Sequence, residues 1–94
     1  MLDLELRGID VWTVYIIKAD CPAGRYIKVG HSCQPQLRCR KYQRPEVLCS
    51  FKCLDKGSAL WLERTLKHRW EDFRILGDEW FDLPENEFFW DKDV

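Results

Sequence analysis

The chain has 94 residues, of which 46% are hydrophobic, with five tryptophans and a formal net charge of -1. Its length suits one small domain with a single modest core, and its hydrophobic content excludes a disordered chain. No apolar run approaches membrane-spanning length, and the acidic first residues do not resemble a secretion signal. We therefore expect a cytoplasmic protein without a membrane span, organised as one domain over residues 1–94, with its core at about 11–83 and an acidic, aromatic extension at 84–94.

The first two predicted elements are strands that form a hairpin. Residues 11–17 and 26–29 are rich in β-branched and aromatic side chains, and the link between them contains the proline and glycine of a loop. Side chains alternate between the two faces of a strand, so Tyr15 and Lys28 can be neighbours on one face if the register allows it.

A helix is predicted to begin at Pro35, because proline suits the first turn of a helix, and to run to about Arg44, where Pro45 stops it. Arg38 and Tyr42 are four residues apart and would lie on the same face of this helix. Residues 47–54 then alternate between apolar and polar side chains, which predicts a third antiparallel strand.

The strongest predicted helix runs from Ala59 to about Phe73, with Ser58 as its N-cap. Glu63 lies beside the apolar stripe of this helix. Burying a carboxylate alone is costly, so Glu63 must be paired, bind a cation or lie at the edge of a cleft. The plainer alternative is a surface ion pair with Lys67 one turn later, worth only a few tenths of a kcal/mol.

Charge is distributed unevenly along the chain. Every charged residue between Cys21 and Pro45 is basic, whereas the C-terminal end is strongly acidic. The basic stretch could attract phosphate, although it could equally be the solvated face of a helix. The candidate nucleic-acid contacts are Arg25, His31, Ser32, Arg40, Lys41 and Arg44.

The five cysteines include no CxxC pair, and we expect reduced thiols. A zinc site formed by His31, Cys33 and Cys39 is the less favoured alternative, because the spacing matches no standard ligand pattern.

An ordered set of residues along the chain suggests a family. These residues are Thr13-Val14-Tyr15, Lys28-Val29-Gly30, Ser32, Arg38, Tyr42, Glu63 and Glu79-Trp80-Phe81. Together they resemble the GIY-YIG nuclease domain, and more closely its small branch that includes phage-type DNA-binding domains and the meiotically up-regulated-gene proteins. Thr13 and Val14 stand where the family name has glycine and isoleucine. The resemblance covers roughly residues 11–83. The alternating strands and the apolar stripe of the helix at 59–73 predict an α+β fold with a three-stranded antiparallel sheet flanked by helices, and this fold would be GIY-YIG-like.

The resemblance also implies a metal-dependent endonuclease that hydrolyses phosphodiester bonds in nucleic acid, with DNA as the expected substrate. Glu63 would hold a Mg²⁺ or Mn²⁺ ion, and Arg38 would contact the phosphate. Tyr15 would accept a proton from the attacking water, with Lys28 and the metal favouring its phenolate form. Tyr42 would hydrogen-bond to either of these two residues.

Three other interpretations stay open at this point. Tyr15 could simply be a half-buried tyrosine of a strand. The chain could grip nucleic acid without cutting it, or it could be a small protein-binding factor that uses its acidic C-terminus. A protein partner or a homodimer is compatible with each of them.

Overall fold

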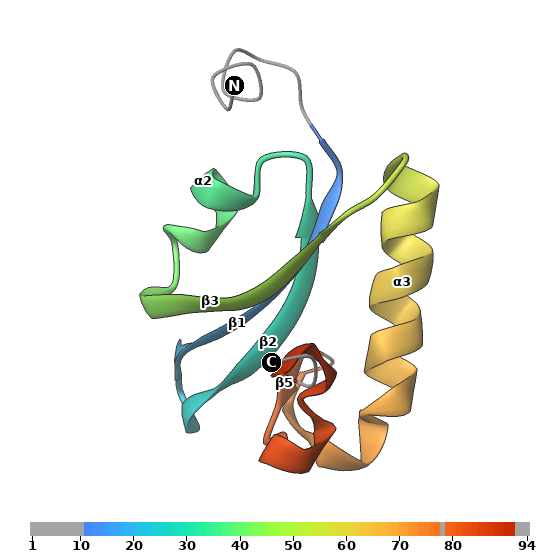
Figure 1. The fold of residues 1–94 in the computed structure, drawn as a ribbon. Coiled ribbons are helices and arrows are strands. Elements are labelled where there is room, and N and C mark those ends of the chain that lie inside the picture. The colour runs from blue at the N-terminus through green and yellow to red at the C-terminus, as the bar shows by residue number, and fades with distance from the viewer. Residues whose placement is uncertain (1–10, 78, 92–94) are drawn as a thin grey trace.

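The computed structural model describes residues 11–77 and 79–91 of the chain. Its elements in chain order are β1 (Thr13–Cys21), β2 (Gly24–Ser32), α2 (Pro35–Cys39), β3 (Gln43–Lys52), α3 (Lys56–Arg69), the 3-10 turn η1 (Glu71–Phe73), β4 (Arg74–Leu76), β5 (Trp80–Phe81), and the 3-10 turns η2 (Glu85–Glu87) and η3 (Phe89–Asp91). The five strands form one antiparallel sheet in the order β3-β1-β2-β5-β4, with α2 over one face and α3 over the other (Figure 1). The predicted α+β class is confirmed, and the sheet is larger than the three strands that we expected.

β1 and β2 form the predicted antiparallel hairpin. Tyr15 lies opposite Gly30, and Ile17 lies opposite Lys28. Residues that face each other across an antiparallel pair project from the same side of the sheet. Tyr15 and Lys28 are therefore on one face, as their alternation along the strands predicted.

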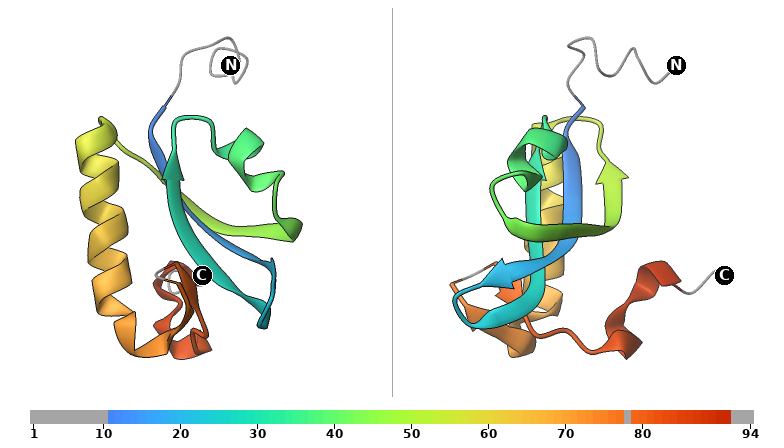
Figure 2. Two further views of the ribbon diagram at one scale, coloured as in Figure 1. Left: turned by 180° about the vertical axis from the view of Figure 1, so that it is seen from behind. Right: turned by 90° about the vertical axis from the view of Figure 1, so that its left-hand side faces the viewer.

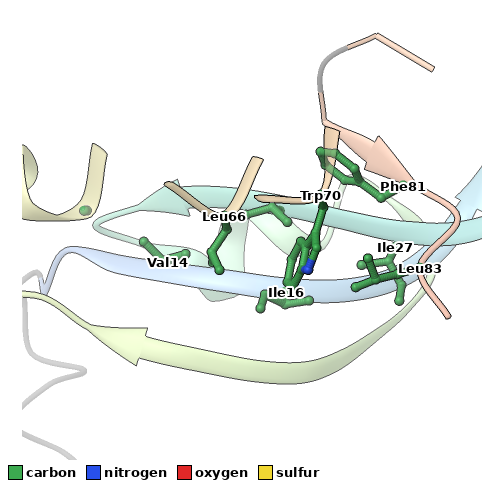
Figure 3. Close-up of a cluster of buried hydrophobic side chains, with 9 residues drawn as sticks. Val14, Ile16, Ile27, Leu66, Trp70, Phe81 and Leu83 are labelled. Atoms are coloured by element: carbon green, nitrogen blue, oxygen red, sulfur yellow. The ribbon is translucent and has the colours of Figure 1, made fainter. Parts of the chain in front are cut away.

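The main hydrophobic core lies between the sheet and α3 (Figure 3). Its buried residues are Val14, Ile16, Ile27, Val29, Ala59, Leu66, Trp70, Phe81 and Leu83. Trp70 is fully buried, and its ring meets the edge of Phe81 with the centroids 6.3 Å apart. Burying a large apolar side chain contributes about 1.5–3 kcal/mol, so this cluster fixes α3 on its face of the sheet.

A smaller cluster lies on the opposite face, under α2, and the views of Figure 2 show α2 and α3 on opposite sides of the strands. Its buried members are Tyr15, Ile17, Ala19 and Cys39, with Tyr42 and Trp80 packed against them. This face therefore combines apolar packing with the phenols of two tyrosines.

The first helix is shorter than predicted, because α2 ends at Cys39 and not near Arg44. The chain then turns tightly, and the backbone amide of Tyr42 donates to the carbonyl of Cys39 at 3.2 Å. Arg44 has a φ of 50°, in the left-handed region that a helix cannot use. After these turns, Tyr42 packs against the smaller cluster on the α2 face of the sheet.

The third strand begins earlier than its predicted start at Val47. Gln43 already pairs with Asp20 of β1, and the strand continues to Lys52. Pro45 is tolerated inside it because β3 is an edge strand and Pro45 lies in the irregular stretch between the pairs Lys18–Glu46 and Asp20–Gln43.

α3 also begins earlier than predicted, and its N-cap is Asp55. The Asp55 carboxylate accepts a hydrogen bond from the backbone amide of Ser58 at 2.8 Å, so the residue expected as the cap supplies the donor instead. At the other end Trp70 leaves the helical conformation, and the chain continues as η1. No helix in the described part of the chain is both long and apolar enough to span a membrane.

The described part of the C-terminal extension, 84–91, folds back onto the main core. Phe89 stacks on Phe51 and on Trp70, with centroids 5.7 and 6.2 Å apart. Trp90 meets Trp70 edge to face at 6.3 Å. The aromatic side chains of this extension therefore pack within the chain.

Candidate functional site

Lys28 lies at the centre of the predicted site. It is only 4% exposed, its side chain forms an ion pair with Glu79, and its Nζ lies 5.4 Å from the centre of the Tyr42 ring. Burial lowers the pKa of Lys28 to about 8, with Lys67 acting in the same direction and Glu63 opposing it. An ammonium with this pKa is charged at neutral pH and can lose its proton at mildly alkaline pH.

Tyr15 and Tyr42 act on each other beside Lys28, and Arg38 is a cation that lowers the pKa of both phenols. Tyr15 is 2% exposed, and this burial, followed by the neighbouring Tyr42, raises the pKa of its phenol well above the ordinary value. We expected Lys28 to favour the phenolate, but the cation that lowers the pKa of Tyr15 is Arg38, and burial outweighs it. The pair is therefore in its phenol form at neutral pH.

Arg38 and Tyr42 meet at the site although Tyr42 lies beyond the end of α2. The turns after the helix place Tyr42 against the cluster on the α2 face, within the electrostatic reach of Arg38, and Trp80 of β5 meets the Tyr42 ring edge to face with the centroids 6.0 Å apart. Arg38 itself is exposed, so its guanidinium is open to solvent at the edge of the cluster.

Gly30 allows the Tyr15 ring to lie against β2. A Cβ atom at Gly30 would be 2.4 Å from the Tyr15 hydroxyl oxygen, a distance that real Cβ atoms do not adopt. Only glycine therefore leaves room for the tyrosine at this place in the sheet.

Glu63 reaches the site from the opposite face of the sheet. It is 8% exposed, and its two carboxylate oxygens contact the imidazole Nδ1 of His31 and the ammonium of Lys67. The pair with Lys67 is the contact expected from the plainer interpretation of this glutamate. Glu63 nevertheless raises the pKa of Lys28, so the groups on the two faces interact electrostatically.

The five predicted catalytic residues are thus brought together in two groups. Tyr15, Lys28, Arg38 and Tyr42 lie on the α2 face, and Glu63 lies on α3. The spacing of these residues along the chain does not predict this division, because it does not show that α2 and α3 lie on opposite faces of the sheet.

A magnesium or manganese ion at this site would have Glu63 as its protein ligand. In the described ranges there is no group of three or more His, Cys, Asp or Glu side chains that could hold a metal ion. Glu63, the buried acid of these ranges, can supply one hard oxygen ligand. Mg²⁺ commonly binds one or two carboxylates together with water and phosphate oxygens, so the rest of its shell would come from solvent and substrate.

Two of the candidate nucleic-acid contacts have structural duties at the turn end of the hairpin. Arg44 binds the Asp20 carboxylate through two nitrogens, at 2.7 and 2.8 Å, and this contact keeps the pKa of Asp20 below its usual range. Arg25 bonds to Asp20 at 3.2 Å and to the Arg44 carbonyl at 2.8 Å. The sequence therefore overestimates the free positive charge of the basic stretch.

The other candidate contacts lie nearer the site. Arg40 and Lys41 are exposed in the turn after α2, and the Lys41 ammonium is 5.8 Å from the centre of the Tyr42 ring. His31 contacts Glu63 and lies 6.0 Å from the Trp12 ring. The Ser32 hydroxyl accepts a hydrogen bond from the Gln34 amide at 2.9 Å, which stabilises the exit from β2.

Glu79 is the site residue that sequence reasoning missed. In the sequence Glu79 belongs to the family pattern, but no contact is predicted for it, because its partner Lys28 lies far away along the chain. A buried lysine at the middle of a strand is a signal that some carboxylate must be near, but it does not say which one.

A shallow surface depression lies at the start of α3 and contains none of these residues. Its lining consists of Cys53, Asp55, Gly57, Ser58, Trp61 and Leu62. The chain matches no protein-family model, no curated protein sequence and no solved structure.

Proposed function

We propose that this chain is a GIY-YIG-like, metal-dependent endonuclease domain that hydrolyses phosphodiester bonds in nucleic acid, with DNA as its substrate. The observation that carries the proposal is the group of Tyr15, Tyr42 and Arg38 beside the buried ammonium of Lys28. Two phenols and two cations on one face can bind a phosphate and handle a proton next to it.

Arg38 and Lys28 would act on the phosphate in different ways. The exposed guanidinium of Arg38 presents a planar fork of donors that matches two phosphate oxygens. Lys28 is a compact charge held in a buried position, where its electrostatic effect on a developing negative charge is stronger than in water. Together they can stabilise the transition state without large movements.

Tyr15 in its phenolate form would accept the proton of the attacking water. Because the pKa values of both Tyr15 and Tyr42 are raised, the phenolate fraction at neutral pH is small and grows tenfold with each pH unit. The residue that would hold a divalent ion is Glu63, and the ion would supply charge neutralisation at the phosphate. Lys67 and His31 hold the Glu63 carboxylate in place for this role.

A second candidate is a domain that binds nucleic acid without cutting it. Two observations favour it: Tyr15 is almost fully buried with a raised pKa, and both oxygens of Glu63 are already in contact with nitrogen atoms of neighbouring side chains. The cations Lys28, Arg38 and Lys41 would still attract phosphate in such a protein.

Substitution of Glu63 by Gln separates these two candidates. Glutamine keeps nearly the same shape and helix propensity but cannot serve as an anionic metal ligand. We expect nicking of supercoiled plasmid DNA in Mg²⁺ or Mn²⁺ to be lost, while DNA retention in EDTA persists or becomes tighter. Glu71→Gln, on an exposed acid that pairs with His68, is the matched control and should cleave like the parent.

The other possible outcomes bear on the role of Glu63 and on the choice between the two candidates. Cleavage by Glu63→Gln at the rate of the parent would remove Glu63 from the reaction, and so would loss of folding judged by circular dichroism. A parent protein that binds DNA in a salt-sensitive way but never cuts it, with or without added Mg²⁺ or Mn²⁺, would establish the second candidate. An RNA substrate run in parallel tests the choice of DNA.

A further inference from the structure

The segment that carries Glu79 is held firmly against the site. The Glu79 carbonyl accepts a hydrogen bond from the Val29 amide at 3.2 Å, which extends the pairing of β5 with β2. The next residue, Trp80, lies opposite Lys28 in the strand register, and Phe81 after it is fully buried in the main core. The backbone position of Glu79 is therefore set by strand pairing and by the core, while its side chain is 44% exposed and reaches Lys28.

Lys28 is surrounded by more cations than anions. The groups that act on it are Glu79 from β5, Arg38 and Lys41 from the α2 side, Glu63 and Lys67 from α3, the Cys39 thiol, and the Tyr42 ring, with Tyr15 on the same face of the sheet. Glu79 makes an ion pair with it, whereas the oxygens of Glu63 contact His31 and Lys67. A buried ammonium that loses its counterion is strongly destabilised and gives up its proton or its position.

We propose that Glu79 is a positioning residue whose carboxylate keeps the Lys28 ammonium charged and fixed at the place where a substrate phosphate binds. This inference rests on the proposed function, because it assigns Lys28 to the phosphate. It adds Glu79 to the residues of the proposed site, and residues 79–81 therefore become part of that site. In the opposite role, Glu79 would occupy the phosphate position and weaken DNA binding, so its removal would strengthen DNA binding.

Substitution of Glu79 by Gln tests the direction of the effect. If Glu79 positions Lys28, the variant should bind a short DNA duplex about tenfold more weakly than the parent, because one charge-assisted contact to phosphate is lost. Its plot of log affinity against log salt concentration should be shallower by about 0.9, the value of one phosphate contact on duplex DNA. Glu79→Asp should restore part of the affinity, because it restores the charge.

The matched control is Glu85→Gln, which removes the same charge from an exposed 3-10 turn. This control should bind DNA as tightly as the parent or slightly more tightly, since a negative charge has been removed from an exposed position that does not pair with Lys28. Glu79→Gln that binds more tightly than Glu85→Gln would overturn the proposal and establish Glu79 as a competitor of phosphate.

The state of Lys28 can be followed without any nucleic acid. In protein isotopically labelled at the lysine side chains, the NMR signal of Lys28 should titrate at a lower pH in Glu79→Gln than in the parent, because the carboxylate that favours the ammonium is gone. The DNA affinity of the variant should accordingly approach that of the parent as the pH is lowered from about 8 to about 6. An unchanged titration of Lys28 would overturn the role of Glu79 even in a parent that binds DNA, whereas a parent that fails to bind DNA would overturn the proposed function and the phosphate contact of Lys28 that rests on it.

Discussion

Gly30 and Tyr15 face each other across β1 and β2, and the tyrosine uses the space that a side chain on the glycine would fill. This close approach places the phenol of Tyr15 within reach of Tyr42. The site therefore depends on a residue that has no side chain, and a methyl group at this position is enough to disturb it.

Gly30→Ala should move the Tyr15 ring and lower the free energy of unfolding by about 1–3 kcal/mol, the usual cost of overpacking a filled core. Urea denaturation followed by circular dichroism measures the loss. Gly57→Ala is the control, because a Cβ there has only an ordinary contact with Asp55 at 3.6 Å, and alanine is the better helix former. An equal loss of stability in both variants would show that the contact with Tyr15 is not responsible.

Arg38→Ala should reduce DNA cleavage by orders of magnitude and leave the melting temperature nearly unchanged. The guanidinium is exposed, so its loss removes little packing, whereas a phosphate loses its bidentate partner. Arg64→Ala on the exposed side of α3 removes the same charge and should have little effect on either quantity. Cleavage by Arg38→Ala at the parent rate would exclude a role for this arginine.

At the scale of elements, α3 carries both core residues and Glu63, so its start has to be fixed. Asp55 does this through its hydrogen bond to the Ser58 amide, and the same contact lowers the pKa of the Asp55 carboxyl. Because the pKa is lowered on folding, the stabilisation is present above the ordinary value of 3.8 and is lost as the pH falls through the lower folded value.

Asp55→Ala should lower the melting temperature at neutral pH, since an amide of the first turn loses its acceptor. The difference between the variant and the parent should shrink as the pH falls from about 4 through the lowered pKa of the folded parent, because the Asp55 carboxylate becomes protonated over this range. Asp55→Asn, whose amide oxygen is also a good cap, should stay close to the parent at neutral pH. A difference that is constant from neutral to acid pH would contradict the assignment of Asp55 as a charged cap.

At the scale of the whole molecule, the chain closes its core with its last described residues. Glu87 accepts a hydrogen bond from the Trp70 indole at 3.2 Å, and the rings of Phe89 and Trp90 cover the same indole. The segment is acidic, but its aromatic side chains are used inside the domain. This packing leaves less apolar surface for a partner than the sequence suggests.

Trp90→Ala should lower the free energy of unfolding by about 2 kcal/mol, below the 3–5 kcal/mol of a fully buried tryptophan because this one is partly exposed. Trp61→Ala removes an equally large ring that is 67% exposed, and it should change stability by no more than about 0.5 kcal/mol. Equal denaturation midpoints for the two variants would mean that the C-terminal segment does not stabilise the core.

The sequence determined the α+β class, the hairpin, the approximate places of the two helices and the shared face of Tyr15 and Lys28. These features depend on alternation, helical periodicity and the positions of Pro and Gly, which act over a few neighbouring residues. It also identified Arg38, Tyr42 and Glu63 as candidate catalytic residues.

Only the tertiary structure decided the end of α2, the two additional strands, the ion pair of Lys28 with Glu79 and the division of the site between two faces of the sheet. These features arise from contacts between residues far apart in the chain, such as the pairing of β5 with β2. Burial and the net pKa changes of Lys28 and Tyr15 belong to the same class, because desolvation depends on everything packed around a group and not on its neighbours in sequence.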